Sequence, residues 1–271
     1  MSVFAAVVLG IVQGLTEFLP VSSSAHLILA RAFFGWEVPG AFGLAFDVAL
    51  HVGTLAAIVA FFSRDILGMV AAVPSILAPG ANLSARLSQR IVVGTIPVVI
   101  VGLTLNDFIE NTLRTPVVAA AALAVGAAVM FAAERLGVMR RGEETVSWLD
   151  AIAIGCAQAS ALIPGVSRSG STIAIGMLLG LRRDAAARFT FLLAIPAMIA
   201  AAAKEALELR HMPLPDGSGT VMGIGVLVSA AVGYLTIKYF LRYLAGNRLD
   251  VFAYYRWALA AATFVFLWPR G

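Results

Sequence analysis

Residues 10–26 read Gly-Ile-Val-Gln-Gly-Leu-Thr-Glu-Phe-Leu-Pro-Val-Ser-Ser-Ser-Ala-His, and residues 155–172 read Gly-Cys-Ala-Gln-Ala-Ser-Ala-Leu-Ile-Pro-Gly-Val-Ser-Arg-Ser-Gly-Ser-Thr. Both stretches open with Gly-x-x-Gln and later place a proline before a Val-Ser-x-Ser tetrapeptide. We therefore interpret them as two copies of one element. Together they hold hydroxyls, a carboxylate, a histidine and an arginine, which are costly in hydrocarbon when unpaired. This cost favours a function, and we interpret the two stretches as the two walls of one functional site.

The composition is that of an integral membrane protein. Of the 271 residues, 61% are hydrophobic and 13% are charged, whereas a soluble domain has about 25% charged residues. The mean hydropathy is +0.94. A spanning helix needs about 20 mostly apolar residues, which predicts an all-α polytopic membrane protein with six transmembrane helices. The six segments lie near 44–62, 90–106, 115–134, 188–204, 219–238 and 251–268.

The order of polar and apolar segments predicts an inverted repeat. The polar linker at 135–148 divides a single membrane domain, 1–271, into repeats of about 1–135 and 148–271. Each repeat has one polar stretch and then three spans, and because three is odd the second repeat is inverted. Inverted repeats commonly build a site near the bilayer midplane from interrupted helices. Prolines at 20 and 164 would break a helix, so we predict two re-entrant helix-loop-helix hairpins, near 3–34 and 150–181.

The distribution of basic residues predicts the orientation. In this arrangement the connections at 63–90, 135–148, 182–188 and 238–248 share one side of the membrane and carry most of the lysines and arginines. The positive-inside bias makes that side cytoplasmic. The first hairpin then enters from the outside, and we expect the site to face the outside. Because orientation accounts for the basic residues, the net charge of +4 does not indicate a nucleic-acid partner.

Arg168 is the most informative single residue. An arginine at the bilayer centre costs at least about 2.5–3.5 kcal/mol on insertion scales, so it needs an anionic partner. Neighbouring hydroxyls and a flexible loop surround it, and a helix starting near Ser169 would point its unpaired N–H groups at the same ligand, for which phosphate is the natural choice. The alternative is a static core in which Arg168 pairs with Glu17 or caps a helix. No Walker-type motif is present, so nucleotide binding is not indicated.

The first stretch supplies candidates for acid–base chemistry. Gln13 and Glu17 are four residues apart and share a helical face, where the carboxylate could hold a divalent cation, orient a base or pair with Arg168. His26 follows Ser23 by three residues, which lets the imidazole meet the hydroxyl as a base activating a nucleophile. A structural hydrogen bond is the alternative for this pair.

Asp47 and His51 form a further polar pair at i and i+4, near the start of the first span. Metal binding is one reading of this pair. A polar pair at the water interface is the reading we favour, and the sequence leaves the role of both residues open.

These motifs resemble the two signatures of the bacitracin-resistance type undecaprenyl-diphosphate phosphatases. The resemblance rests on residues 13–26 and 164–172 and extends over the whole chain, including 46–51 and 194–197. Gln13 and Glu17 match an acid-or-glutamine-x3-Glu element, although many relatives carry glutamate at the first position. Ser22, Ser23 and His26 match a Ser-Ser-x-x-His element, and the Pro-Gly-x-Ser-Arg-Ser-x-x-Thr element ends at Thr172.

The resemblance implies an enzyme of the bacterial plasma (inner) membrane that hydrolyses undecaprenyl diphosphate to the monophosphate and so recycles the lipid carrier of peptidoglycan precursors. It also implies a divalent cation, Mg²⁺ or Ca²⁺, held partly by Glu17. On this basis we expect Ser23 to attack the terminal phosphorus, with His26 as general base and then acid, and Arg168 to stabilise the developing charge. Direct attack by water, with His26 or Glu17 as base, is the other route. The expected substrate-binding residues are Gln13, Ser22, Gly165, Ser167, Ser169 and Thr172.

A second function class fits the same architecture. Inverted repeats with polar hairpins at the midplane are typical of transporters, so a polyprenyl-phosphate transporter or flippase is the alternative. Ser23 and His26 beside Arg168 favour the enzyme. The expected partners are a polyprenyl diphosphate lipid and the bilayer, and the sequence leaves open whether the chain forms a homodimer.

Overall fold

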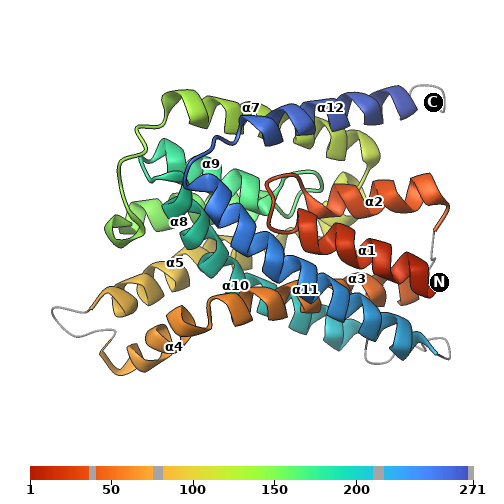
Figure 1. The fold of residues 1–271 in the computed structure, drawn as a ribbon, viewed down its shortest axis with the longest axis horizontal. Helices are drawn as coiled ribbons and strands as arrows, with labels where there is room; N and C mark the ends of the chain where they lie inside the picture. The colour runs from red at the N-terminus through yellow and green to blue at the C-terminus, as the bar shows by residue number, and fades with distance from the viewer. Residues whose placement is uncertain (37–40, 76–81, 210–216, 268–271) are drawn as a thin grey trace. The chain divides into compact units, whose positions relative to one another are not determined.

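The chain breaks into pairs of short helices at both polar stretches. The computed structural model describes residues 1–36, 41–75, 82–209 and 217–267. In it, α1 (Val3–Thr16) is followed by α2 (Ser23–Phe34), and α8 (Trp148–Ser160) is followed by α9 (Arg168–Leu178) (Figure 1). Each break contains its predicted proline. Neither stretch is a straight, continuous helix, as predicted, and the re-entrant path of the two pairs stays a prediction.

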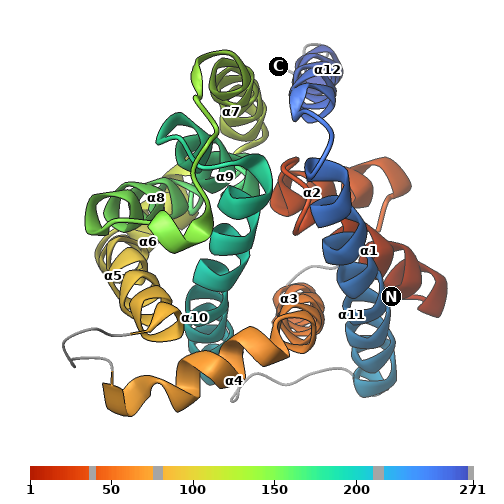
Figure 2. The ribbon, with the colours of Figure 1, turned by 60° about the vertical axis from the view of Figure 1, so that its left-hand side comes forward.

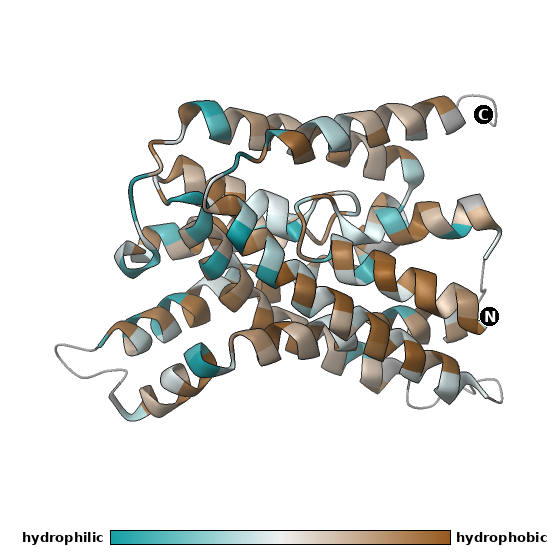
Figure 3. Cartoon of the chain, in the orientation of Figure 1, coloured by the Kyte–Doolittle hydropathy of each residue, from teal (hydrophilic) through white to brown (hydrophobic). Residues whose placement is uncertain are grey.

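Five helices in the described part of the chain are long and apolar enough to cross a membrane. The structure is therefore that of a multi-pass helical membrane protein, with no strand among the described residues. Figure 3 shows hydrophobic residues along most of α1 and α11 and hydrophilic ones in the connection between α7 and α8. The five are α3 (Ala41–Phe61), α5 (Leu83–Thr104), α7 (Pro116–Leu136), α10 (Arg183–Leu209) and α11 (Ser218–Leu244).

The sixth predicted span corresponds to α12 (Asp250–Leu267), which is not among these five. Its first two turns contain Asp250 and Arg256 together with aromatic residues, which lower its mean hydropathy. The count of six spans is thus not confirmed. The remaining short elements are α4 (Ser63–Ala71), η1 (Val73–Ser75), α6 (Asn106–Phe108), η2 (Ile109–Leu113) and η3 (Glu143–Thr145).

The helices form two compact units. Unit 1 contains Met1–Leu19, Ser23–Phe61 and Ala194–Phe240, and unit 2 contains Pro20–Ser22, Phe62–Leu193 and Leu241–Gly271. Each unit draws on both halves of the sequence. The division into repeats at 1–135 and 148–271 stays a prediction.

Unit 1 is held together by close helix approach around a small core. Leu9, Phe46 and Leu50 are fully buried there. A Cβ atom on Gly53 would lie 2.0 Å from Ser229 Oγ, so only glycine lets α3 approach α11 this closely. At this crossing Ser229 Oγ donates a hydrogen bond of 3.0 Å to the Leu50 carbonyl. Small and hydroxyl residues are what packed helices in membranes use at their contacts.

Unit 2 is a series of neighbouring helices. α12 packs along α7, α7 packs on α9, α9 packs on α8, and α8 packs on α5. Figure 2 shows α7, α9, α8 and α5 side by side in this order. The contact of α8 with α5 is very close, because a Cβ on Gly155 would lie 2.2 Å from the Gly94 carbonyl oxygen. The pair α8–α9 is thus enclosed between α5 and α7.

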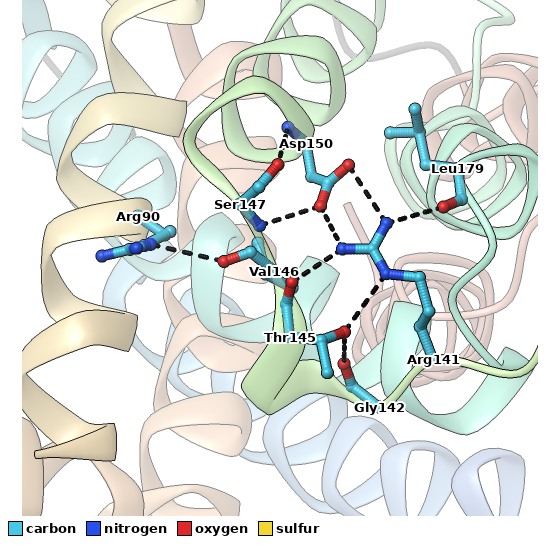
Figure 4. A network of polar contacts seen from close by, with 8 residues as sticks. All are labelled: Arg90, Arg141, Gly142, Thr145, Val146, Ser147, Asp150 and Leu179. Carbon is cyan, nitrogen blue, oxygen red and sulfur yellow. Dashed lines mark hydrogen bonds and ion pairs between the residues drawn. The ribbon is translucent and has the colours of Figure 1, made fainter.

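A polar network fixes the start of α8 (Figure 4). Arg141 donates to Asp150 Oδ2 at 2.6 Å and to the Leu179 carbonyl at 2.8 Å. The Ser147 N–H also donates to Asp150 at 2.8 Å, completing a capping box. Burial alone would raise the pKa of Asp150, but the hydrogen bonds from Arg141 and Ser147 outweigh it and hold that pKa below its ordinary value.

Asp150→Asn is therefore expected to destabilise the protein by about 2 kcal/mol at pH 7, the usual worth of hydrogen bonds to a charged group. A lowered folded pKa gives stability that is fully present above the unfolded pKa of about 3.9 and is lost as the pH falls through the folded value. The wild-type melting temperature should hence fall toward the variant's as the pH drops below about 4. Thermal unfolding in detergent measures both. Asp184→Asn removes a carboxylate from a more exposed pair with Arg182 and should cost less; an equal cost for the two variants would contradict this account.

Candidate active site

The first polar stretch places a serine hydroxyl on a buried glutamate. Glu17 is 9% exposed and Gln13 is fully buried in the last turns of α1. Gln13 Nε2 donates to Glu17 Oε2 at 3.0 Å, which confirms that they share one helical face. Ser23 Oγ, at the first residue of α2, donates to the same oxygen at 2.7 Å. The break between α1 and α2 thus turns the chain so that Ser23 faces the carboxylate.

Glycines let α1 carry this polar face against a neighbouring helix. A Cβ on Gly14 would lie 2.8 Å from the Cβ of Val232, and one on Gly10 would lie 3.0 Å from the Cβ of Val228. The helix that approaches these two glycines is α11. This packing fixes the end of α1, where Gln13 and Glu17 lie.

The hydrogen-bond partner of Ser23 differs from the one that the sequence predicted. The spacing of Ser23 and His26 indicated a hydroxyl–imidazole contact, whereas the hydroxyl donates to Glu17. The physical reason is the turn before α2, which directs the first residue of that helix back toward α1. His26 lies one turn further along α2.

A second histidine lies near the glutamate. His51 Nε2 on α3 is 3.9 Å from Glu17 Oε2, and its Nδ1 is 2.8 Å from the Asp47 carbonyl oxygen. The Asp47 carboxylate forms an ion pair with Arg31, including a hydrogen bond of 2.9 Å from Nη1. The prediction that Asp47 and His51 form a polar pair at the water interface did not include these neighbours. The periodicity of α3 does not reveal that its polar face meets α1 and α2.

The second polar stretch builds the N-terminus of α9. Ser167 is the N-cap, and its Oγ accepts a hydrogen bond from the Gly170 N–H at 3.1 Å and lies 3.2 Å from Ser169 Oγ. Arg168 is the first helical residue, one position before the expected start. Thr172 Oγ1 donates to the Arg168 carbonyl at 2.6 Å. The first turn of a helix has N–H groups without intrahelical partners, so this end of α9 has the polarity that attracts an anion.

Backbone conformation explains the glycine before this cap. Gly165 has φ +90°, and a Cβ there would lie 2.2 Å from the Ala119 carbonyl oxygen on α7. Ser22, in the matching turn of the first stretch, also has a positive φ of 74°, which a residue with a side chain adopts only at some cost. Both serine-rich turns thus depart from regular helix geometry where the sequence predicted interruptions.

Comparison with known proteins places the chain in a family. The model of a family described as bacitracin resistance protein BacA matches residues 6–262. This chain belongs to that family. An undecaprenyl-diphosphatase of Rubrobacter xylanophilus is 46% identical to it over 94% of this chain and 95% of the relative. A protein of Moorella thermoacetica with the same name is 43% identical over the full length of both, and an undecaprenyl-diphosphatase 2 of Stutzerimonas stutzeri is 45% identical over 98% of both.

The family membership confirms the resemblance found in the two polar stretches. Within the structure, Gln13, Glu17, Ser23 and His26 belong to unit 1, and Ser22 and residues 165–172 belong to unit 2. The structure brings together Gln13, Glu17, Ser23 and His51 in one unit and Ser167 with Ser169 in the other.

The residues at Glu17 fit a divalent cation. Gln13 Oε1 is buried and accepts no hydrogen bond from the described residues. Together with the Glu17 carboxylate it offers the oxygen ligands that Mg²⁺ and Ca²⁺ prefer. No cluster of three or more His, Cys, Asp or Glu side chains suited to a metal occurs in the described part of the chain. A cation here would thus take its remaining ligands from water and from the phosphate groups of a substrate.

Two polar residues of this family member were not identified as important from sequence. Gln158, the repeat counterpart of Gln13, is buried on α8, and neither of its amide atoms has a partner among the described residues. Arg256 on α12 is 1% exposed. Arg256 lies inside the predicted span at 251–268, and this position could have identified it from the sequence. A guanidinium buried at such depth needs hydrogen-bond acceptors.

Proposed function

We propose that this protein is an integral membrane phosphatase that hydrolyses undecaprenyl diphosphate to undecaprenyl phosphate and inorganic phosphate. The full-length relatives that carry the name undecaprenyl-diphosphatase support this function. One observation carries it: the Ser23 hydroxyl donates to the buried carboxylate of Glu17 at 2.7 Å. A hydroxyl bound to a base in this way is the arrangement expected of an activated nucleophile. The product would return to the pool of lipid carrier for peptidoglycan precursors.

The hydrogen bond from Ser23 to Glu17 supports Glu17 as the base in the first proton transfer. The Ser23 proton passes to Glu17 Oε2 as Oγ forms a bond to the terminal phosphorus, and the bond from that phosphorus to the bridging oxygen breaks. Undecaprenyl phosphate leaves with the electron pair and receives a proton from His26. Water then forms a bond to the phosphorus as the bond from phosphorus to Ser23 Oγ breaks, and inorganic phosphate leaves. His26 takes a proton from the water, and Ser23 regains its own from Glu17. In this mechanism His26 acts as acid and then as base. The sequence also predicted that His26 removes the Ser23 proton, which Glu17 takes here.

The second stretch would bind the phosphoryl group during transfer. Arg168 at the start of α9 supplies a guanidinium for two phosphate oxygens, and the hydroxyls of Ser167, Ser169 and Thr172 come from the same turn and the next. Charge on a transferring phosphoryl group spreads over its equatorial oxygens. Fixed donors aimed at those oxygens therefore stabilise the transition state more than the bound substrate. Gln13, Ser22 and Gly165 complete the proposed substrate-binding set.

A divalent cation, Mg²⁺ or Ca²⁺, fits beside these groups. Glu17 and Gln13 would hold it through carboxylate and amide oxygens. When bound, it would neutralise negative charge on the diphosphate. In the proposed arrangement six spans and two re-entrant hairpins form an inverted repeat in the inner membrane, and the site faces the outside.

Phosphate release by purified protein tests the function. In detergent with undecaprenyl diphosphate, we expect one inorganic phosphate per lipid and undecaprenyl phosphate as the lipid product. A chelator should stop the reaction, and Mg²⁺ or Ca²⁺ should restore it. Folded protein that releases no phosphate, or that releases pyrophosphate and the free alcohol, would refute the assignment.

A further inference from the structure

We propose that Arg256 is a positioning residue for the phosphatase reaction, and that its guanidinium holds the backbone of the loop that presents Ser167 and Arg168. This inference rests on the proposed function, because the loop is assigned there to phosphate binding. Arg256 lies on α12, which packs along α7 in unit 2 (Figure 1). It acts through the loop and not on the substrate.

The guanidinium binds backbone carbonyls from separate segments. Nη2 donates to the Gly165 carbonyl at 3.2 Å, in the loop before α9. Nη1 lies 3.4 Å from the carbonyl of Pro20, which belongs to the same unit. Nε and Nη2 also donate at 3.2 Å to the carbonyls of Leu123 and Ala122 on α7. One planar group with five N–H donors therefore joins α7 to the loop at 165 and to the turn at 20.

Two glycines leave the space that this guanidinium occupies. A Cβ on Gly126 of α7 would lie 2.1 Å from Nη2, and a Cβ on Gly170 of α9 would lie 2.9 Å from Nη1. Alanine at either position would thus displace the group. Arg256 is accommodated from both sides, by α7 and by the first turn of the helix that Arg168 begins.

The carbonyls at 20 and 165 explain why an arginine is present. They lie where the chain leaves helix geometry, and such acceptors are costly to bury without a donor. Only two residues separate Gly165 from Arg168, so a shift of this carbonyl moves the N-cap and the arginine with it. Small displacements of a positioning group can cost about 100-fold in rate. Lysine keeps the charge but has a single ammonium group. That group cannot bond to the carbonyls at 20 and 165 at the same time, as the separate nitrogens of a guanidinium do.

The test measures kcat and KM for phosphate release from undecaprenyl diphosphate, with melting temperature in detergent as the measure of folding. Arg256→Lys and Gly126→Ala are each expected to lower kcat/KM at least 10-fold while the protein stays folded. Gly223→Ala on α11 is the matched control, because a Cβ there meets nothing within 4 Å, and it should keep wild-type kinetics. Gly126→Ala displaces the guanidinium without removing it, so this variant still tests the proposal if Arg256→Lys does not fold.

A double-mutant cycle with Ser167→Ala separates positioning from a general loss of stability. If Arg256 acts through the loop, the combined loss in kcat/KM is smaller than the product of the two single losses. Wild-type kinetics in both Arg256→Lys and Gly126→Ala, or losses that multiply in the cycle, would overturn the proposal. A wild-type protein that releases no phosphate would instead refute the proposed function, so the two failures are distinguishable.

Discussion

Arg168→Ala is expected to lower kcat/KM for undecaprenyl diphosphate by about 100- to 1,000-fold, the range found when one preorganised donor to a developing oxyanion is removed. Arg168 begins α9 directly after the cap formed by Ser167, so its backbone is fixed before the substrate binds. The guanidinium offers two parallel hydrogen bonds to a phosphate. Steady-state phosphate release measures the loss.

Two further variants separate the effect of bidentate geometry from that of charge and provide a control. Arg168→Lys keeps the charge and loses the bidentate geometry, so its activity should lie between those of wild type and Arg168→Ala. Arg182→Ala removes another arginine that is exposed and pairs with Asp184, and it should leave turnover unchanged. Equal activity of Arg168→Ala and Arg182→Ala would show that Arg168 does not bind the phosphate.

Ser23→Ala is expected to lower kcat by about 1,000-fold or more, since loss of a nucleophile in an acyl-transfer enzyme costs more than this. The substitution removes the atom that attacks phosphorus and leaves the carboxylate of Glu17 in place. KM should change little, because Arg168 and most of the other groups proposed to bind the phosphate lie in the second stretch. Single-turnover kinetics separate the two parameters.

Ser88→Ala is the control for this serine. Its hydroxyl donates to the backbone one turn earlier in α5, at 2.9 Å from the Ser84 carbonyl, so its loss should leave kcat unaltered. Ser23→Ala with at least half of the wild-type kcat would mean that water attacks phosphorus directly, and the nucleophile assignment would be wrong.

Local sequence rules were enough to locate the helix breaks and the polar face of α1. Proline removes a backbone donor and clashes with the preceding turn, and at 20 and 164 a serine-rich turn follows it. Pro97 and Pro196 have no such turn after them and lie inside α5 and α10. The i, i+4 rule likewise predicts that Gln13 and Glu17 meet. These features depend on neighbours in the chain, and the structure confirms them.

Helix ends among polar residues were less predictable. α5 begins at Leu83, capped by Asn82, whose side chain accepts from the Ala85 N–H at 2.9 Å, whereas hydropathy indicated a span from about 90. The arginines at 86 and 90 hid this first part, because hydropathy reports burial in lipid and not helix formation. The connection after α3 also folds, as α4 and η1.

Contacts between distant segments were not predictable from local pattern. The partner of Ser23 depends on the direction of the turn before α2, and the proximity of His51 to Glu17 depends on how α3 packs. Arg256 contacts segments separated from it by 91 to 236 residues, so no periodicity within α12 could identify its partners. In each case tertiary packing selects the contact.

In the proposed mechanism, Ser23 receives the phosphoryl group that Arg168 binds. Rapid acid quenching of the wild-type protein with undecaprenyl diphosphate labelled in its terminal phosphate tests this most directly. We expect labelled protein within the first turnover, with the label on Ser23 and absent from Ser23→Ala. Phosphate release without any labelled protein, or a label on another residue, would contradict it.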